Sequence, residues 1–278
     1  VLKVAEEKKI AIAAFTVDTL EVAEEIASVA EEKQLPAIMM VGQNTFKYNK
    51  LEKIASICRQ IANSTNAQLV LHLDHGASYE QVIQCLRNGF TSVMIDGSRL
   101  PLKENIRVTK EVTRAAHTVG VSVEAELGAI GGTEDGVTSN GELADPAECK
   151  QIADLGVDFL ACGIGNIHGV YPADWAGLSF ERLGEIKAQT GDLPLVLHGG
   201  TGIPEDQIKK AISLGISKIN VNTDLQLVFA KGVREYIEAG KDQQGKGFDP
   251  RKLLAPGAKA IEAKCKEKIE LFGCAGKG

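Results

Sequence analysis

The chain has 278 residues, of which 44% are hydrophobic and 24% are charged, an ordinary composition for a globular protein. Its formal net charge of −6 argues against nucleic acid as a partner, because nucleic-acid binders present a basic face. No apolar run approaches the roughly 20 residues that a membrane-spanning helix needs, so we expect no membrane partner either.

Short β-branched or apolar runs alternate with longer helical stretches along the whole chain. Eight runs are predicted to be strands: Ile10–Phe15, Pro36–Val41, Gln68–His75, Ser92–Asp96, Ser122–Leu127, Phe159–Ile164, Leu193–His198 and Lys218–Asn222. Between them, apolar residues recur with helical spacing, as in Glu21–Glu32 and Asn105–Val119. Alternating strands and helices of this length are typical of an α/β protein with a parallel sheet.

Eight strand–helix units favour closure into a (β/α)8 TIM barrel, which typically takes about 250 residues. The alternative, an open doubly wound sheet, would carry a glycine-rich fingerprint after its first strand, whereas Phe15 is followed by Thr16-Val17-Asp18. The polar segment 240–247 is expected to form an exposed loop, and Pro250–Phe272 a helix that packs on the barrel or on a partner subunit. We predict one domain over residues 1–278, with additional C-terminal helices from about residue 249.

The six cysteines lie far apart and form no C-x-x-C pair. Cys58, Cys85, Cys149 and Cys162 fall in apolar or helical patterns, where they are interpreted as small buried side chains. Disulfides are rare in reducing compartments, so we expect a cytoplasmic protein.

Acids, histidines and asparagines gather where the predicted strands end. In chain order these are Asp74 and His75, Asp96, Glu124 and Glu126, His168, His198, and Asn220, Asn222 and Thr223. A barrel brings the carboxyl ends of its strands to one face, where the active groups of barrel enzymes lie. A lone histidine at such a place usually makes only a hydrogen bond. Three of them, His75, His168 and His198, each beside glycine, indicate a catalytic zinc site with an open position.

The two remaining histidines have less specific interpretations. His72 lies inside the third strand and either orients a neighbour or fills the core, and the pattern favours the core. His117 lies in a helical segment with no partner visible in the sequence, so it is interpreted as structural.

Three segments that follow the strands carry a further signal, and two of them are rich in glycine. Gly199–Gly202 and the segment 220–224 follow the seventh and eighth strands, where barrels commonly bind phosphate through backbone N–H groups and a helix N-terminus. The segment Gly131–Gly136 carries two acids, and it is either a flexible solvent loop or a lid that brings a carboxylate to the site.

Several long motifs together resemble the class II ketose-bisphosphate aldolases, the family of fructose- and tagatose-bisphosphate aldolases. They are HLDHG, SVMIDGS, SVEAELG with the following GG-x-EDG, GNIHGVY, LVLHGGTGIP, SKINVNTD and FDPRKLL, and the resemblance runs nearly from end to end. It implies reversible cleavage of a ketose 1,6-bisphosphate to dihydroxyacetone phosphate and glyceraldehyde 3-phosphate. It also implies a role in carbohydrate metabolism and glycolysis, and a homodimer or homotetramer.

Carried over by motif, the resemblance assigns roles to individual residues. It implies a catalytic zinc ion on His75, His168 and His198, with Asp96 and Glu126 as ligands of an alternative or second metal site. It implies catalytic roles for Asp74 at the hydroxyl of the breaking bond, for Glu134 in moving the carbon-bound proton, and for Asn220. Substrate contacts are implied for Gly169, Gly199, Gly200, Thr201, Asn220, Val221, Asn222 and Thr223, and for Arg251 reaching the distal phosphate from a neighbouring subunit. A second divalent metal or a monovalent cation is a further expectation.

The chain departs from the family pattern at three places. Thr16 follows Phe15 where the family has asparagine, Val41–Asn44 lacks a usual serine or threonine, and Tyr171–Trp175 replaces a basic loop. These departures leave open a substrate other than a bisphosphate, such as a phosphorylated keto-sugar acid.

The chemistry agrees with a metal route. Cleavage beside a carbonyl leaves an enediolate, which needs either a Lewis acid or a protonated imine. The imine route would need a lysine at the carboxyl end of a strand, and Lys218 is expected at the start of the eighth strand instead. A metal-dependent hydrolase and a non-catalytic sugar-phosphate-binding subunit are the alternatives.

Overall fold

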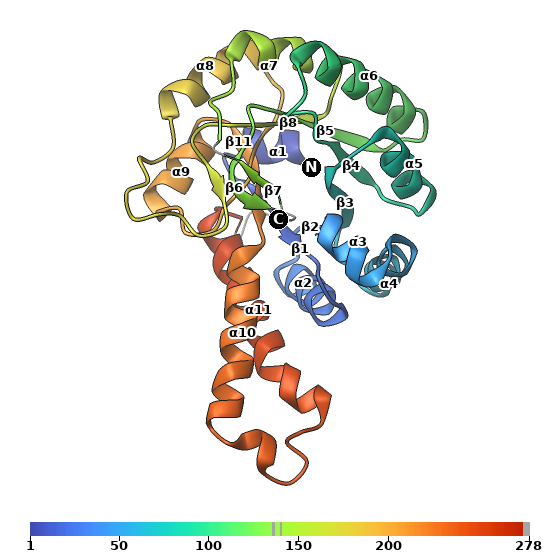
Figure 1. The fold of residues 1–278 in the computed structure, drawn as a ribbon, viewed down its shortest axis with the longest axis vertical. Helices are drawn as coiled ribbons and strands as arrows, with labels where there is room; N and C mark the ends of the chain where they lie inside the picture. Colours follow the sequence, from blue (N-terminus) through green and yellow to red (C-terminus); the bar gives the residue numbers. More distant parts are fainter. Residues whose placement is uncertain (135–136, 140, 275–278) are drawn as a thin grey trace.

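The computed structural model describes residues 1–134, 137–139 and 141–274 (Figure 1). Eight strands close into a parallel barrel, and each pairs with its two neighbours in the following order. They are β1 (Ile12–Thr16), β11 (Ile216–Val221), β10 (Leu195–Leu197), β8 (Phe159–Cys162), β5 (Ser122–Leu127), β4 (Ser92–Ile95), β3 (Leu69–Gly76) and β2 (Ala37–Val41). The predicted TIM barrel is confirmed.

Helices surround the barrel, as the apolar spacing predicted. Their bounds are α1 (Leu2–Glu7), α2 (Leu20–Lys33), α3 (Gln43–Asn49), α4 (Leu51–Ser64), α5 (Tyr79–Arg87), α6 (Leu102–Thr118), α7 (Pro146–Ala153), α8 (Phe180–Thr190), α9 (Glu205–Ser213), α10 (Thr223–Glu238) and α11 (Pro250–Leu271). Ser78, Asp145 and Ser179 cap the first turns of α5, α7 and α8 by accepting backbone N–H bonds. In the part of the chain that is described, no helix is long and apolar enough to cross a membrane.

The predicted C-terminal helix is α11. It packs along α10 and also against α2, and the pair α10 and α11 projects from the barrel as an arm (Figure 1). The segment 240–247 at the far end of the arm is not a plain loop, since it contains a 3-10 helix at Lys241–Gln243.

The segment after β5 was interpreted as either a flexible solvent loop or a lid, and its described residues form two strands. It contains β6 (Gly131–Glu134) and β7 (Val137–Ser139), which pair in antiparallel fashion, while residues 135 and 136 lie outside the described residues. β6 also pairs with β9 (Ile167–His168), with Gly132 opposite His168. The hairpin backbone therefore lies beside one of the predicted metal ligands.

All six cysteines are buried and none forms a disulfide, as expected for small core side chains. Burial raises the pKa of Cys58 and of Cys85 to about 12. These thiols therefore stay protonated at neutral pH and add apolar volume to the helix–strand packing.

Candidate metal centre and active site

Three histidines that are remote in sequence meet at the carboxyl ends of the strands. His75 ends β3, His198 directly follows β10, and His168 lies in β9, beyond the end of β8. One ring nitrogen from each lies within 4.8 Å of the others. The ring centroids are 5.1 Å apart for His75 and His168, 4.8 Å for His75 and His198, and 5.8 Å for His168 and His198. The three rings thus form one cluster.

The backbone at His75 is bent to place its ring. Its φ of 46° lies in the left-handed region, and the register between β3 and β4 shifts between Leu73 and Gly76. A side chain at Gly76 would collide with the carbonyl of Met94, 2.2 Å from where Cβ would lie. Gln43 at the start of α3 donates a hydrogen bond to the carbonyl of His75 at 2.9 Å. A strained residue held by its surroundings is a common feature of functional sites.

Two carboxylates fix how the rings of His75 and His198 face each other. His75 Nδ1 lies 2.8 Å from Asp96 Oδ2, and His198 Nε2 lies 2.8 Å from Glu124 Oε1. Since a carboxylate accepts, these two nitrogens carry protons, and the opposite nitrogens present lone pairs. Those nitrogens, Nε2 of His75 and Nδ1 of His198, are 3.1 Å apart.

Two lone pairs at this distance repel each other unless a proton or a cation lies between them. A tetrahedral zinc ion with nitrogen ligands at about 2.0–2.1 Å would separate two of them by roughly 3.4 Å, close to the observed spacing. The donor set and its geometry therefore fit a divalent cation held by His75, His168 and His198.

The electrostatic surroundings suit this role. Burial lowers the pKa of His168 well below its usual value, and the nearby His75 and His198 lower it further. The pKa of His198 is also lowered, by burial that outweighs the opposing charge of Glu124. Both rings are thus neutral and can donate a lone pair. Burial also acts to lower the pKa of His75, but Asp74, Asp96 and Glu126 outweigh it and raise that pKa well above its usual value.

The acids predicted as alternative ligands lie beside His75. His75, Asp96 and Glu126 form a second group whose ligand atoms lie within 4.8 Å of one another. Glu126 Oε2 is 3.9 Å from His75 Nδ1 and 3.7 Å from His198 Nδ1, and it is buried without a hydrogen-bond partner among the described residues. Burial and the charge of Asp96 raise the pKa of Glu126 well above its usual value. A cation that displaced the proton of this carboxyl group would bind Asp96, Glu126 and His75 together.

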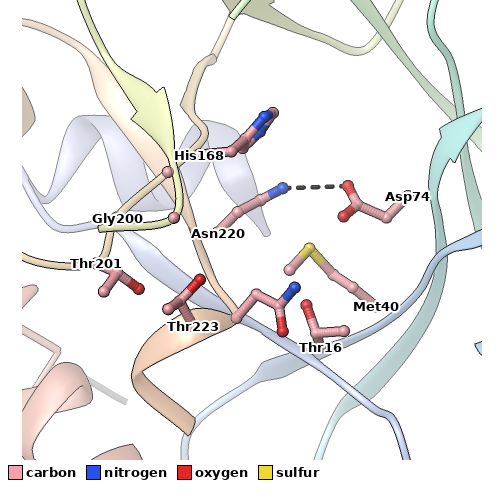
Figure 2. A pocket seen from close by; sticks show the side chains of 11 residues that line it. Thr16, Met40, Asp74, His168, Gly200, Thr201, Asn220 and Thr223 are labelled. Atoms are coloured by element: carbon pink, nitrogen blue, oxygen red, sulfur yellow. Dashed lines mark hydrogen bonds between the residues drawn. The ribbon is translucent and has the colours of Figure 1, made fainter. Parts of the chain in front are cut away.

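Asp74 lies beside the histidine cluster on the wall of a pocket of about 290 Å³ (Figure 2). Asn220 of β11 donates a hydrogen bond from Nδ2 to Asp74 Oδ1 at 3.1 Å. Thr16 and Met40 face the same space from β1 and β2. The pocket thus joins a carboxylate, an amide and one of the metal-site histidines.

The glycine loops line the opposite side of this pocket. The residues are Gly169, Gly199, Gly200, Thr201, Asn222 and Thr223, and α10 begins there with Thr223. A side chain at Gly199, where φ is 68°, would place Cβ 1.9 Å from the carbonyl of Ile167. Exposed backbone N–H groups beside a helix N-terminus are suited to an anion such as phosphate.

The side chain of Val221 does not line the pocket, although the sequence motif included it. Side chains alternate along a strand, so Lys218 and Asn220 face the barrel interior while Val221 faces the surrounding helices.

Two predicted site residues do not join this cluster within the described structure. The backbone of Glu134 ends β6, but its side chain lies outside the described residues. Arg251 lies on the first turn of α11, with its side chain 89% exposed and paired with Asp249 at 2.7 Å. It is not among the residues that line the pocket of its own chain, and its helix α11 belongs to the projecting arm (Figure 1).

Several residues that position the site were missed in the sequence. Tyr171, at a departure from the family pattern, accepts from the N–H of Ile167 at 3.0 Å and donates to the carbonyl of Gly199 at 2.8 Å. Asn166 donates to the carbonyl of His198 at 3.0 Å. These bonds connect the loop that carries His168 to the loop that follows His198. The neighbouring GNIH and HGG motifs were the only sequence signal for them.

His72 and His117 have partners that the sequence did not show, and the predicted place of Lys218 needs correction. His72 is buried as expected, but it lies 3.3 Å from Glu124, the acid that orients His198. His117 has a partner, Asp158, at 2.8 Å. Lys218 is not at the start of its strand, because β11 begins at Ile216, and its amine lies inside the barrel, 2.7 Å from Glu124.

Comparisons with known proteins agree with this geometry. The family described as "Fructose-bisphosphate aldolase class-II" matches residues 1–277. The fructose-bisphosphate aldolase of Streptococcus pyogenes is 44% identical over 284 residues, covering 99% of this chain and 97% of that protein. The fructose-bisphosphate aldolase of Mycoplasma pneumoniae is 44% identical over 281 residues, again covering 99% and 97%.

A solved structure extends the comparison to three dimensions. The YdjI aldolase of Escherichia coli matches with a TM-score of 0.85 at 33% identity, covering 99% of this chain and 96% of that one. On these grounds, the chain belongs to the class II fructose-bisphosphate aldolase family, and it is an aldolase of the lyase class.

Proposed function

We propose that the chain catalyses reversible, zinc-dependent aldol cleavage of a ketose 1,6-bisphosphate, either fructose or tagatose bisphosphate, to dihydroxyacetone phosphate and glyceraldehyde 3-phosphate. The observation that carries this proposal is the convergence of His75, His168 and His198 beside a pocket that presents the carboxylate of Asp74. The names of the relatives at 44% identity support the substrate class.

Asp74 takes the proton of the hydroxyl on the carbon at which the bond breaks. Burial acts to raise the pKa of Asp74, but the electrostatic influence of His75, His198 and Lys218 outweighs it and lowers that pKa, so the group is a carboxylate. Asn220 holds one oxygen of that carboxylate through Nδ2. Its own Oδ1 is buried without a hydrogen-bond partner among the described residues, so it can accept a bond from a substrate hydroxyl.

The bound zinc would stabilise, as a Lewis acid, the negative charge that develops on the carbonyl oxygen. The loops at Gly199–Thr201 and at the start of α10 hold the first phosphate and so fix the carbonyl near the histidines. Glu134 moves the carbon-bound proton, and its place at the end of β6, two residues after the partner of His168, supports this role.

The proposed enzyme is also an oligomer that binds further cations. Arg251 reaches the distal phosphate of a neighbouring subunit in a homodimer or homotetramer, which its exposure on the arm permits. Asp96 and Glu126 hold an alternative or second divalent ion with His75, and a monovalent cation assists at the phosphate loops. The enzyme works in cytoplasmic carbohydrate metabolism, in glycolysis.

A second candidate substrate is a phosphorylated keto-sugar or keto-sugar acid without a distal phosphate. Among the described residues that line the pocket, none is lysine or arginine, and Met40 adds an apolar surface near Asp74. Arg99 contributes to lowering the pKa of His168 but is not part of the pocket wall. This lining favours a substrate with one phosphate unless a neighbouring subunit supplies the second counter-charge.

A substrate panel separates the two candidates. The zinc-loaded enzyme is assayed for dihydroxyacetone phosphate release from fructose 1,6-bisphosphate, tagatose 1,6-bisphosphate and ketose 1-phosphates with neutral or carboxylate distal ends. The first proposal predicts the highest kcat/KM for a bisphosphate, and a higher value for a 1-phosphate would replace it with the second. Inactivation by borohydride in the presence of substrate would overturn the metal route for both.

A further inference from the structure

Lys218 is a fully buried lysine to which the proposed reaction gives no part except its charge near Asp74. It lies in β11, two residues before Asn220, so both side chains enter the barrel interior. Burying an ammonium group is costly unless it is paired and hydrogen-bonded. The position of Lys218 inside the barrel, two residues before Asn220 of the pocket, therefore suggests a role beyond packing.

Glu124 connects Lys218 to a predicted metal ligand. Its Oε2 accepts from Lys218 Nζ at 2.7 Å, and its Oε1 accepts from His198 Nε2 at 2.8 Å. All three side chains have 0% exposure. Each carboxylate oxygen thus has its own donor, one on β11 and the other just after β10.

The His72 ring also lies against the Glu124 carboxylate. Its Nε2 lies 3.3 Å from Glu124 Oε2, and its Nδ1 lies 2.7 Å from the hydroxyl of Ser92 on β4. The carboxylate therefore has little freedom to rotate away from His198. That rigidity fixes which nitrogen of His198 faces His75, since Nε2 is held by Glu124 and Nδ1 is left to point at the cluster.

We propose that Lys218 and Glu124 form a positioning pair that holds His198 ready to bind the cation, with Lys218 anchoring the carboxylate that orients the imidazole. The inference rests on the metal-binding part of the proposed function. A buried ion pair by itself adds little stability compared with apolar side chains of the same size, so packing alone does not account for it. Groups that hydrogen-bond to metal-binding histidines typically change metal affinity about 10–100-fold.

Two matched double variants test the pair without leaving a buried charge unpaired. Both carry Lys218→Met; one adds Glu124→Gln, which keeps an oxygen that can accept from His198, and the other adds Glu124→Leu, which does not. Zinc affinity is measured by competition with a chromogenic chelator, and the visible absorption of the cobalt(II)-loaded proteins reports ligand geometry. The proposal predicts at least about tenfold tighter zinc binding in the Gln variant, with a cobalt spectrum closer to that of the wild type. Equal affinities and equal spectra in the two variants would overturn it.

Single substitutions test the contribution of Lys218. Lys218→Met is compared with Lys187→Met, which removes a partly buried lysine paired with Glu6 at the amino end of the barrel. The proposal predicts weaker zinc binding for Lys218→Met and unchanged zinc binding for Lys187→Met. Wild-type zinc affinity in folded Lys218→Met would refute the role of Lys218. If that single variant does not fold, Glu124→Gln is compared with Lys218→Met/Glu124→Gln, and equal zinc affinity of these two variants would refute it. Absence of zinc binding by the wild-type protein would refute the proposed function instead, so the two failures are distinguishable.

Discussion

His75 Nε2 and His198 Nδ1 face each other across 3.1 Å, although the two residues are 123 positions apart in the sequence. Asp96 is hydrogen-bonded to the other ring nitrogen of His75, and Glu124 to the other ring nitrogen of His198. The protein therefore directs these two nitrogens toward one point without any ion, as a preorganised metal site requires. Preorganisation of this kind reduces the cost of ordering the ligands on binding.

Asp74→Asn is expected to lower kcat by at least about 10²-fold while zinc affinity stays close to that of the wild type. The amide retains an oxygen that can accept from Asn220 but cannot take the substrate proton. Steady-state kinetics and a zinc titration measure the two effects. Asp158→Asn, which changes a half-exposed acid paired with His117, serves as the control and should keep full activity. A kcat for Asp74→Asn within a few-fold of the wild type would exclude Asp74 as the base.

Gly199→Ala is expected to raise KM by roughly tenfold or more, because about 1.4 kcal/mol of lost phosphate binding corresponds to a factor of ten. Its Cβ would lie 1.9 Å from the carbonyl of Ile167, so the loop must move. Gly191→Ala is the control, since Gly191 also has a positive φ, of 60°, while its Cβ meets open space. Gly191→Ala should lose about 1–3 kcal/mol of stability and keep its KM. Equal KM values for the two variants would contradict a phosphate role for this loop.

Tyr171→Phe is expected to cost about 1–3 kcal/mol of unfolding free energy and to weaken zinc binding. The hydroxyl bridges the N–H of Ile167 and the carbonyl of Gly199, so its loss frees the segment next to His168. Tyr236→Phe also removes a single tyrosine hydroxyl, one that donates to the carbonyl of Gly247 in the arm, and should leave zinc affinity unchanged. Urea unfolding and chelator competition distinguish the two variants. A Tyr171→Phe protein with wild-type zinc affinity would show that the bridge only stabilises the fold.

Alkaline pH is expected to destabilise the protein through its buried thiols. Burial raises the pKa of Cys58 and of Cys85 from 9.0 to about 12, so between these values the folded state keeps protons that the unfolded state loses. Their contribution to stability is complete below about pH 9 and falls by roughly 1.4 kcal/mol per thiol for each pH unit up to about 12. Guanidinium unfolding at pH 8 and pH 10.5 measures this loss. The Cys58→Ala/Cys85→Ala variant should lose less stability over the same interval, and an equal loss would contradict the assignment.

The sequence predicted the barrel because eight apolar runs alternate with helical periods, and the strand boundaries followed closely. Ser122–Leu127 was predicted with its observed bounds. The convergence of the histidines followed from the rule that strand ends share one face. The pairing of β6 with β9 was not predictable, because Gly131–Glu134 begins with two glycines, which are depleted in strands.

The contacts that orient the site residues could not be predicted from the sequence either. Side-chain alternation already placed Lys218 and Asn220 on one face of the predicted strand, but it did not show which groups meet the lysine inside the barrel. The bond between Glu124 and His198 joins residues 74 positions apart, and no local pattern encodes which oxygen meets which nitrogen. Motifs therefore predicted the groups that gather at the candidate site, while the groups that orient them required coordinates.

The most direct test of the central claim is a reconstitution titration. The purified enzyme is stripped with a chelator, zinc is added back stepwise, and bound zinc and aldol cleavage are measured on the same samples. We predict that cleavage is lost on stripping and rises linearly to a maximum at about one zinc per chain, and that His198→Ala neither binds this ion nor recovers activity. Full cleavage activity in the stripped protein, or in His198→Ala, would contradict the claim that the three imidazoles hold a catalytic cation.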